Sequence, residues 1–170
     1  MKSGLTIRED NYSSVLDALK QLSGTDVLVG IPIPAGPPRD DAPLSNAELG
    51  YLQSTGATVE IDGETVTLPP RPFLDMGIED SRDKTTERLK LAAQSALEGK
   101  ADVASMHLEA AGQIARDASK AVIEAGDRLT PLSEKTIKKR REMKPPIPGD
   151  KPLRARGFLF RAIQYVVRKE

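Results

Sequence analysis

The side chains best suited to acid–base or metal chemistry are one histidine and two adjacent carboxylate pairs. His107 lies within a predicted helix, and the carboxylate pairs are Asp40-Asp41 and Glu79-Asp80. Imidazole binds transition metals or accepts a proton, and neighbouring carboxylates can bind Mg²⁺. A metal site at His107 would depend on carboxylates alone, because the chain has no second histidine and no cysteine. We therefore interpret His107 as a helix-flank residue, and the acidic pairs as solvated charges of a loop and a helix start.

The sequence lacks the motifs of the common enzyme classes. It has no glycine-rich phosphate loop of the dinucleotide or P-loop type, and no Gly-x-Ser-x-Gly nucleophile turn. Disulfides and thiolate metal sites are excluded by the absence of cysteine. We expect a protein that is not an enzyme and has no catalytic residue, cofactor or metal. A small carboxylate-dependent hydrolase is an alternative that no group of residues supports.

A basic run near the C-terminus is the segment best suited to anions. Residues 135–144 carry six cations, and the strongest candidates for an interaction are Lys138, Lys139, Arg140 and Arg141. Such a run can follow a phosphate backbone, so contact with DNA is one interpretation. No aromatic residue is interleaved, so base stacking is not implied. A solvated helix face is the other interpretation.

The net charge of zero hides a division of the chain into an acidic and a basic part. Residues 1–127 carry 12 Lys/Arg and 21 Asp/Glu, whereas residues 128–170 carry 13 Lys/Arg and 4 Asp/Glu. The two parts therefore have net charges of −9 and +9. Such asymmetry points to a nucleic acid, an acidic partner or head-to-tail self-association, unless the two parts neutralise each other within one fold.

Hydrophobic periodicity and turn residues predict the elements that would position these charges. Apolar residues at helical spacing predict helices over residues 12–22, 46–56, 80–97, 102–125, 132–141 and 157–162. Asn46, Asp80 or Ser81, and Asp102 are the expected caps of the second, third and fourth of these helices. A hairpin is expected over residues 57–70, with a turn at Asp62-Gly63. Residues 27–31 read as a buried central strand, and residues 164–168 as a closing strand.

Residues 32–45 interrupt this regular pattern. They include five prolines, one glycine and the pair Asp40-Asp41. Proline fixes φ and lacks the backbone donor, so an extended loop or arm is expected here. We expect this arm to be mobile in the free monomer and ordered by a partner.

Together these elements predict one α+β domain over residues 1–170. A small, mostly antiparallel sheet would pack against two long helices, with proline-rich loop excursions outside. The basic part, residues 128–170, would close the sheet. No apolar run approaches the roughly 20 residues that span a bilayer, and residues 1–10 lack the apolar core of a signal peptide. We therefore expect that the protein does not contact a membrane and that it is assembled in a cytoplasm.

Three segments, in this order, resemble a known family. The first joins Val29-Gly30-Ile31-Pro32 to Asn46-Ala47-Glu48-Leu49 and runs to Gly56, and the second is residues 68–74, Leu-Pro-Pro-Arg-Pro-Phe-Leu. The third comprises residues 129–137, 151–159 and 162–167. Together they resemble the tail-completion and neck proteins of long-tailed bacteriophages, a group that includes minor tail and virion-morphogenesis proteins. This chain departs from the family pattern at Arg156, where threonine is usual, and in its proline-rich loop.

The resemblance implies a structural protein of the virion at the head–tail junction. It implies a homo-oligomeric ring, six-fold in symmetry, that touches the tail-terminator and head-completion proteins and joins the tail to the head. A tail terminator or an assembly factor of the same phage is the alternative, and a small DNA-binding protein is the alternative from another class. Beyond the basic run, the expected interaction residues are Arg71, Lys151, Arg154 and Arg156.

Two smaller expectations concern the residues around these segments. Pro72 pre-sets the backbone, so Arg71 and Phe73 would be held rigidly. We expect Arg71 to bridge to a carboxylate within or between subunits, and Phe73 to anchor the core. Gly157 would take a positive φ before Phe158, which we also assign to the core.

Overall fold

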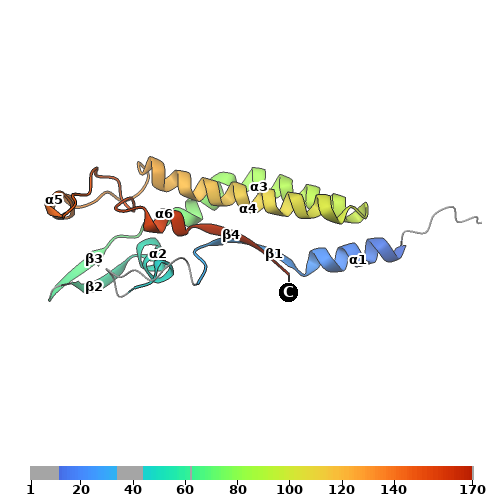
Figure 1. The fold of residues 1–170 in the computed structure, drawn as a ribbon, viewed down its shortest axis with the longest axis horizontal. Helices are drawn as coiled ribbons and strands as arrows, with labels where there is room; N and C mark the ends of the chain where they lie inside the picture. Colours follow the sequence, from blue (N-terminus) through green and yellow to red (C-terminus); the bar gives the residue numbers. More distant parts are fainter. Residues whose placement is uncertain (1–11, 34–43, 62, 170) are drawn as a thin grey trace, which may run out of the picture.

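The structure is a computed structural model that describes residues 12–33, 44–61 and 63–169 (Figure 1). Within these residues there are six helices and two separate two-stranded antiparallel sheets. The elements are α1 (Tyr12–Ser23), β1 (Thr25–Gly30), α2 (Asn46–Thr55), β2 (Ala57–Ile61), β3 (Glu64–Leu68), α3 (Phe73–Leu97), α4 (Ala101–Ala125), α5 (Glu134–Glu142), α6 (Phe158–Ala162) and β4 (Gln164–Lys169). The α+β class is therefore confirmed. Most of the proline-rich arm, residues 34–43, lies outside the described residues.

The two long helices α3 and α4 lie side by side and form the body of the molecule (Figure 1). Small buried residues line their contact, among them Gly77, Ala92, Ala111 and Ser119. A Cβ at Gly77 would run into the backbone of Ser119, so the glycine sets how closely the helices approach. The helix pair thus depends on small side chains on both partners.

The ribbon β1–β4 pairs residues from the two ends of the described chain. Thr25 lies opposite Lys169, and Gly30 lies opposite Gln164. One face of the ribbon packs on α4, where Tyr165 lies against Gly112. On the ribbon, Leu28 and Val166 are each 46% exposed. The prediction of a buried central strand at residues 27–31 is therefore wrong, because β1 has a single strand partner among the described residues and an exposed leucine.

The hairpin of β2 and β3 forms a second sheet at one end of the molecule, beside α2 (Figure 1). The sequence predicted this hairpin correctly, but it does not join the ribbon in one sheet. Ser45, not Asn46, caps α2, since its side chain accepts from the Glu48 backbone while Glu48 accepts from the Ser45 backbone. This reciprocal pair is a capping box, which satisfies two otherwise open donors.

Helix α3 begins at Phe73, seven residues before the expected start at Asp80. Pro72 occupies the cap position, where its fixed φ and missing N–H are tolerated at a helix start. Phe73 is fully buried in a core cluster with Val122, Ile123, Leu129, Leu159 and Ile163. Burial of this ring stabilises a first turn that the proline-rich sequence had obscured.

Four other expectations can be compared with the structure. Phe73 is a core residue as expected, and Gly157 has the expected positive φ of 73°. Phe158, however, is 39% exposed and does not belong to the core. Lys100, and not the expected Asp102, occupies the cap position of helix α4.

Among the described residues, no helix is both long enough and apolar enough to cross a membrane.

Candidate functional site

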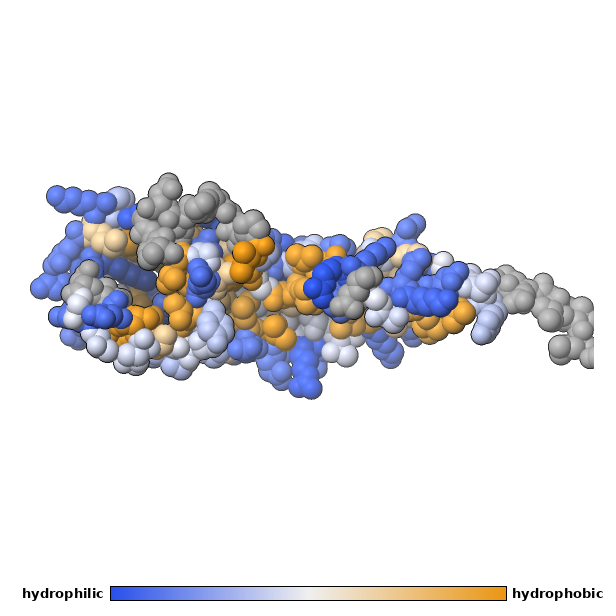
Figure 2. All heavy atoms as spheres, turned by 90° about the horizontal axis from the view of Figure 1, so that it is seen from below, coloured by the Kyte–Doolittle hydropathy of each residue, from blue (hydrophilic) through white to orange (hydrophobic). Residues whose placement is uncertain are grey.

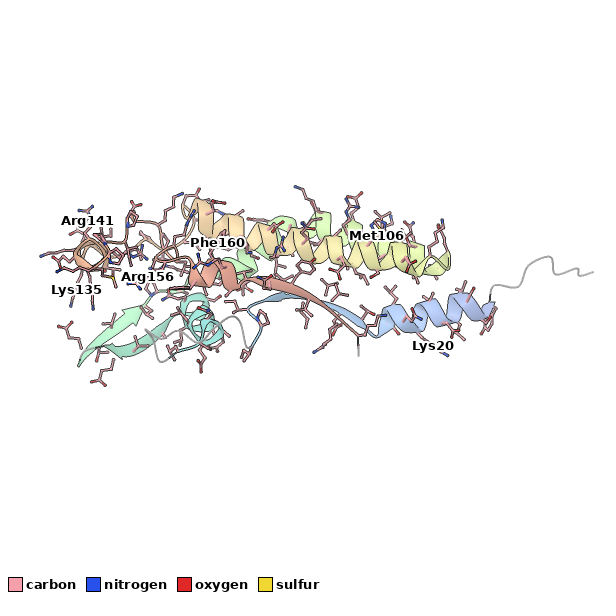
Figure 3. The ribbon with its side chains drawn as sticks, viewed as in Figure 1. Lys20, Met106, Lys135, Arg141, Arg156 and Phe160 are labelled. Atoms are coloured by element: carbon pink, nitrogen blue, oxygen red, sulfur yellow. The ribbon has the colours of Figure 1, made fainter. Side chains whose placement is uncertain are left out.

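A groove of about 1000 Å³ lies between α2, β3, α5 and the segment 153–159. These elements gather at the end of the molecule that carries the hairpin, and Figure 2 shows hydrophilic side chains there with hydrophobic ones between them. Apolar residues in its lining include Leu49, Leu68, Met143, Ile147 and Leu153. We call it the basic groove because its lining also holds five cations, namely Arg71, Lys135, Lys139, Arg140 and Arg156. Lys135 and Arg156 mark this end in Figure 3.

Arg71 is the most deeply buried of these cations, with 5% of its surface exposed. Its Nε donates to the Thr130 carbonyl at 2.7 Å, Nη2 to the Pro131 carbonyl at 3.1 Å and Nη1 to Gln53 Oε1 at 3.1 Å. Its backbone N–H donates to the Gln53 carbonyl at 2.8 Å. Arg71 therefore joins α2 to the segment before α5. The expected carboxylate partner is not found among the described residues, where its acceptors are neutral oxygens.

Arg140 lies near Arg71 and is partly buried. Its Nη1 donates to the Lys151 carbonyl at 3.0 Å. Burial lowers the pKa of the Arg140 guanidinium, and burial together with the charge of Arg140 lowers the pKa of Arg71. Both groups stay protonated because an arginine side chain does not deprotonate in proteins. The groove thus holds two like charges, which favour an anion in their vicinity.

One carboxylate, Glu64, belongs to the described lining of the groove. Lys135 donates to Glu64 Oε2 at 2.6 Å, which ties the first turn of α5 to β3. This hydrogen bond and ion pair lower the pKa of Glu64 and raise the pKa of Lys135. The described lining of the groove therefore holds five cations and one carboxylate.

The structure separates the predicted interaction residues into three groups. Arg71, Lys139, Arg140 and Arg156 line the groove. Lys138 and Arg141 are exposed on α5 but do not line it. Lys151 and Arg154 turn toward the end of α4, where Lys151 donates to the Glu124 carbonyl at 2.7 Å and Arg154 donates to the Glu124 carboxylate at 3.4 Å.

The candidates for metal chemistry are not brought together. His107 lies half-buried in α4, and the described residues include no group of three or more His, Asp or Glu side chains arranged to hold a metal ion. Glu79 pairs with Arg82, and Asp80 pairs with Arg128. Asp40-Asp41 lie outside the described residues.

Sequence reasoning missed Phe158 as a groove residue. Its exposed ring lines the groove, and the Arg161 guanidinium lies over it at 5.2 Å from the ring centroid. A cation over an aromatic face is a favourable contact. The spacing of Phe158 and Arg161, three residues apart on a helical turn, is the signal that could have revealed this arrangement.

Comparison of the chain with protein-family models, with curated proteins and with solved structures found no match. The function of the chain is therefore inferred from its residues and from the groove.

Proposed function

We propose that this chain is a non-catalytic structural component of a phage virion, located at the neck or tail end. In this proposal its copies form a homo-oligomeric ring of six-fold symmetry that joins the tail to the head. The ring contacts the tail-terminator and head-completion proteins, and the basic groove is the surface that makes a contact between chains. A tail terminator or assembly factor of the same phage is the closest alternative.

The observation that supports this proposal is the position of the three family-like segments. The first contributes Leu49 and Gln53 to the groove, and the second contributes Leu68, Pro69 and Arg71. The third supplies most of the remaining lining, from residues 131–136 and 153–159. Segments far apart in sequence thus meet around one concave surface. Such convergence is what a shared binding surface requires of a fold.

The chemistry of the groove suits a contact between proteins. Its apolar side chains supply area that can be buried, whereas its cations supply orientation and partner choice. Surface ion pairs are worth only about 0–1 kcal/mol each. A ring repeats one heterologous contact around its axis, so small energies add over the assembly.

Mass spectrometry and imaging of virions purified from the phage that encodes this chain test the proposal. We expect the chain in intact particles, in six copies or a multiple of six, and located between head and tail. Its absence from particles that are otherwise complete would contradict a structural role and favour an assembly factor.

A DNA-binding function is the second candidate, favoured by the exposed cations Lys138 and Arg141 beside the groove. It requires binding to duplex DNA that weakens steeply with salt, because phosphate contacts release counterions. Titration of the chain against duplex DNA at several salt concentrations measures this. Reversal of Lys138 and Arg141 to Glu would abolish such binding while rings still form, if the cations face DNA in the lumen of the ring.

A further inference from the structure

Neither outer edge of the ribbon β1–β4 is covered by another strand in the described part of the chain. Among these residues each strand pairs with the other alone, and no backbone hydrogen bond from another element closes either edge. Every second residue of an edge strand directs its N–H and C=O outward, so the edge can pair with a further strand. Proteins commonly block such an edge with a proline, a lysine or a bulge, and β1 contains none of these.

The face of the ribbon that points away from α4 has an ordered arrangement of charged and apolar side chains. Val27 lies against α4, so its neighbours Asp26 and Leu28 point to the opposite face. On that face Leu28 lies opposite Val166, and each is 46% exposed. Asp26 lies opposite Arg168 and accepts a hydrogen bond from it at 2.9 Å. Figure 2 views the molecule from this side and shows hydrophobic side chains beside hydrophilic ones.

These side chains decide which strand fits the open edge of β1. A β4 strand from a second copy, in the register that β4 has within the subunit, would place its Arg168 beside Asp26. The same register would place its Val166 beside Leu28. Opposite charges and apolar pairs directly across two strands stabilise a sheet. A second β1 offers Asp26 no cation and a second β4 offers Arg168 no carboxylate, because neither strand contains one.

The directions of the two strands also suit a repeated contact. Because β1 and β4 are antiparallel, a copy placed alongside in the same orientation brings its β4 antiparallel to β1 of the first copy. Two different edges then meet, and repetition of such a head-to-tail contact closes a ring when the rotation allows it. The described lining of the basic groove includes no residue of β1 or β4, so the groove stays available for another protein.

We propose that the open edge of β1 receives β4 from a second copy of this chain, so that the ribbons of successive copies form one continuous antiparallel sheet. Leu28 then lies between two copies of Val166, and Asp26 lies between two copies of Arg168. The apolar pair that one subunit exposes is thereby covered from the side by its neighbour. This inference rests on the proposed function, since it supplies the contact that would build the ring.

Cysteine crosslinking tests the contact directly, because the chain contains no cysteine. Leu28→Cys in one preparation is mixed with Val166→Cys in another and then oxidised. Each chain carries one cysteine, so a disulfide between the two variants joins β1 of one copy to β4 of another. We expect this mixed dimer to exceed the dimers of like variants by about fivefold, because only the mixed pair lies directly across two strands.

Met106→Cys replaces Leu28→Cys in the control, since Met106 is 69% exposed on α4 (Figure 3). Equal crosslinking of Met106→Cys, an absence of the mixed dimer, or an excess of dimers of like variants would each overturn the proposal. Gly30→Cys with Gln164→Cys, which also lie opposite each other, provides a second pair if either first variant fails to fold.

A locked chain distinguishes addition of a strand from exchange of strands between copies, which would give the same mixed dimer. Leu28→Cys and Val166→Cys in one chain, oxidised at high dilution, join its own β1 to its own β4. We expect the locked chain to associate within about twofold of the wild type in sedimentation, because the outer edge of the pair stays open. Association that is lost in the locked chain and returns on reduction would show exchange and overturn the proposal.

Reversal of the ion pair tests the register. Asp26→Arg with Arg168→Asp keeps opposite charges within each chain, so copies of this variant should associate with one another as wild-type copies do. Mixed with labelled wild-type chain, it should form about threefold fewer mixed contacts, because each such contact places like charges side by side. Glu79→Arg with Arg82→Glu reverses an exposed ion pair of α3 and should mix freely. Free mixing of the ribbon variant would contradict the proposed register.

The two proposals fail in different ways. A chain that crosslinks as expected but is absent from virions contradicts the structural function and leaves the contact intact. A chain present in virions whose Leu28→Cys and Val166→Cys variants give no mixed disulfide keeps the function and removes the contact.

Discussion

Gly77 of α3 lies directly against the backbone of Ser119 in α4, with no room for a side chain at the glycine. Ser119 is fully buried, and its hydroxyl donates to the Ala115 carbonyl at 2.9 Å within its own helix. The two helices therefore meet backbone to backbone at this level. The helices can approach this closely because the side chain of Gly77 is only a hydrogen atom.

Gly77→Ala should lower the free energy of unfolding by about 1–3 kcal/mol, the usual cost of an extra methyl group in a packed interface. The better helix propensity of alanine offsets only part of this cost. Urea denaturation followed by circular dichroism measures the change. Gly30→Ala is the control, because nothing lies within 4 Å of its added Cβ. An equal loss in both variants would show that the close approach at Gly77 is unimportant.

Arg71→Leu should destabilise the chain by about 1–3 kcal/mol, since it leaves the partly buried carbonyls of Thr130 and Pro131 without their donor. The stability of Arg71→Lys should lie between that of Arg71→Leu and that of the wild type, because an ammonium group cannot reproduce the planar fork of donors. The same denaturation experiment measures both. Arg82→Leu, at an exposed arginine, should change the stability by less than about 0.5 kcal/mol. A stable Arg71→Leu chain would refute the bridging role.

The stability should fall in acid as two ion pairs are lost. Hydrogen bonds from Lys135 and Arg128 hold the pKa values of Glu64 and Asp80 below their ordinary values of 4.5 and 3.8. A lowered folded-state pKa contributes stability that is full above the ordinary value and is lost as the pH falls through the folded value. Unfolding measured from pH 7 to pH 2 should therefore show a decline beginning near pH 4.5.

Glu64→Gln with Asp80→Asn should flatten this decline, because the neutral side chains no longer titrate. High salt should also reduce it, since both pairs are solvent-exposed and screened by ions. A double variant with the full acid sensitivity of the wild type would show that other carboxylates dominate.

If the chain has the proposed virion function, His107→Gln should leave folding, assembly and infectivity within a small factor of wild type. The side chain is half-buried on α4, and no cluster of metal ligands surrounds it in the described part of the chain. Complementation of a phage that lacks the gene, with titres of wild-type and variant, measures the effect. A complete loss of infectivity from a normally folded variant would reopen a metal or catalytic role for this histidine.

Patterns that are local in sequence were predictable. The hairpin follows from alternation around Asp62-Gly63, and α4 from its apolar stripe and the glycine after Ala125. The start of α3 could not be predicted in this way, because the prolines before Phe73, taken alone, indicate a break in regular structure. Burial of the Phe73 ring against α4 and α6 extends the helix backward, and only tertiary packing supplies that energy.

Strand pairing and the groove depend on contacts between distant residues. The sequence predicts β1, β4 and the hairpin, but no pattern in it indicates that β1 and β4 form one sheet while β2 and β3 form another. Likewise Arg71 is a candidate because of its rigid setting beside Pro72, and Arg140 because it belongs to the basic run. The fold brings them to one groove, and their neutral acceptors could not be inferred from either local pattern.

The ribbon β1–β4 has a consequence for synthesis of the protein. Residues 25–30 leave the ribosome long before residues 164–169 exist, so β1 has no strand partner until synthesis has reached residue 169. Contacts between such distant residues form late and slowly. A chain that stops before β4 therefore cannot complete the ribbon on α4, and a proteolytic or chaperone machinery that recognises exposed strands can distinguish it from a chain in which the ribbon has formed.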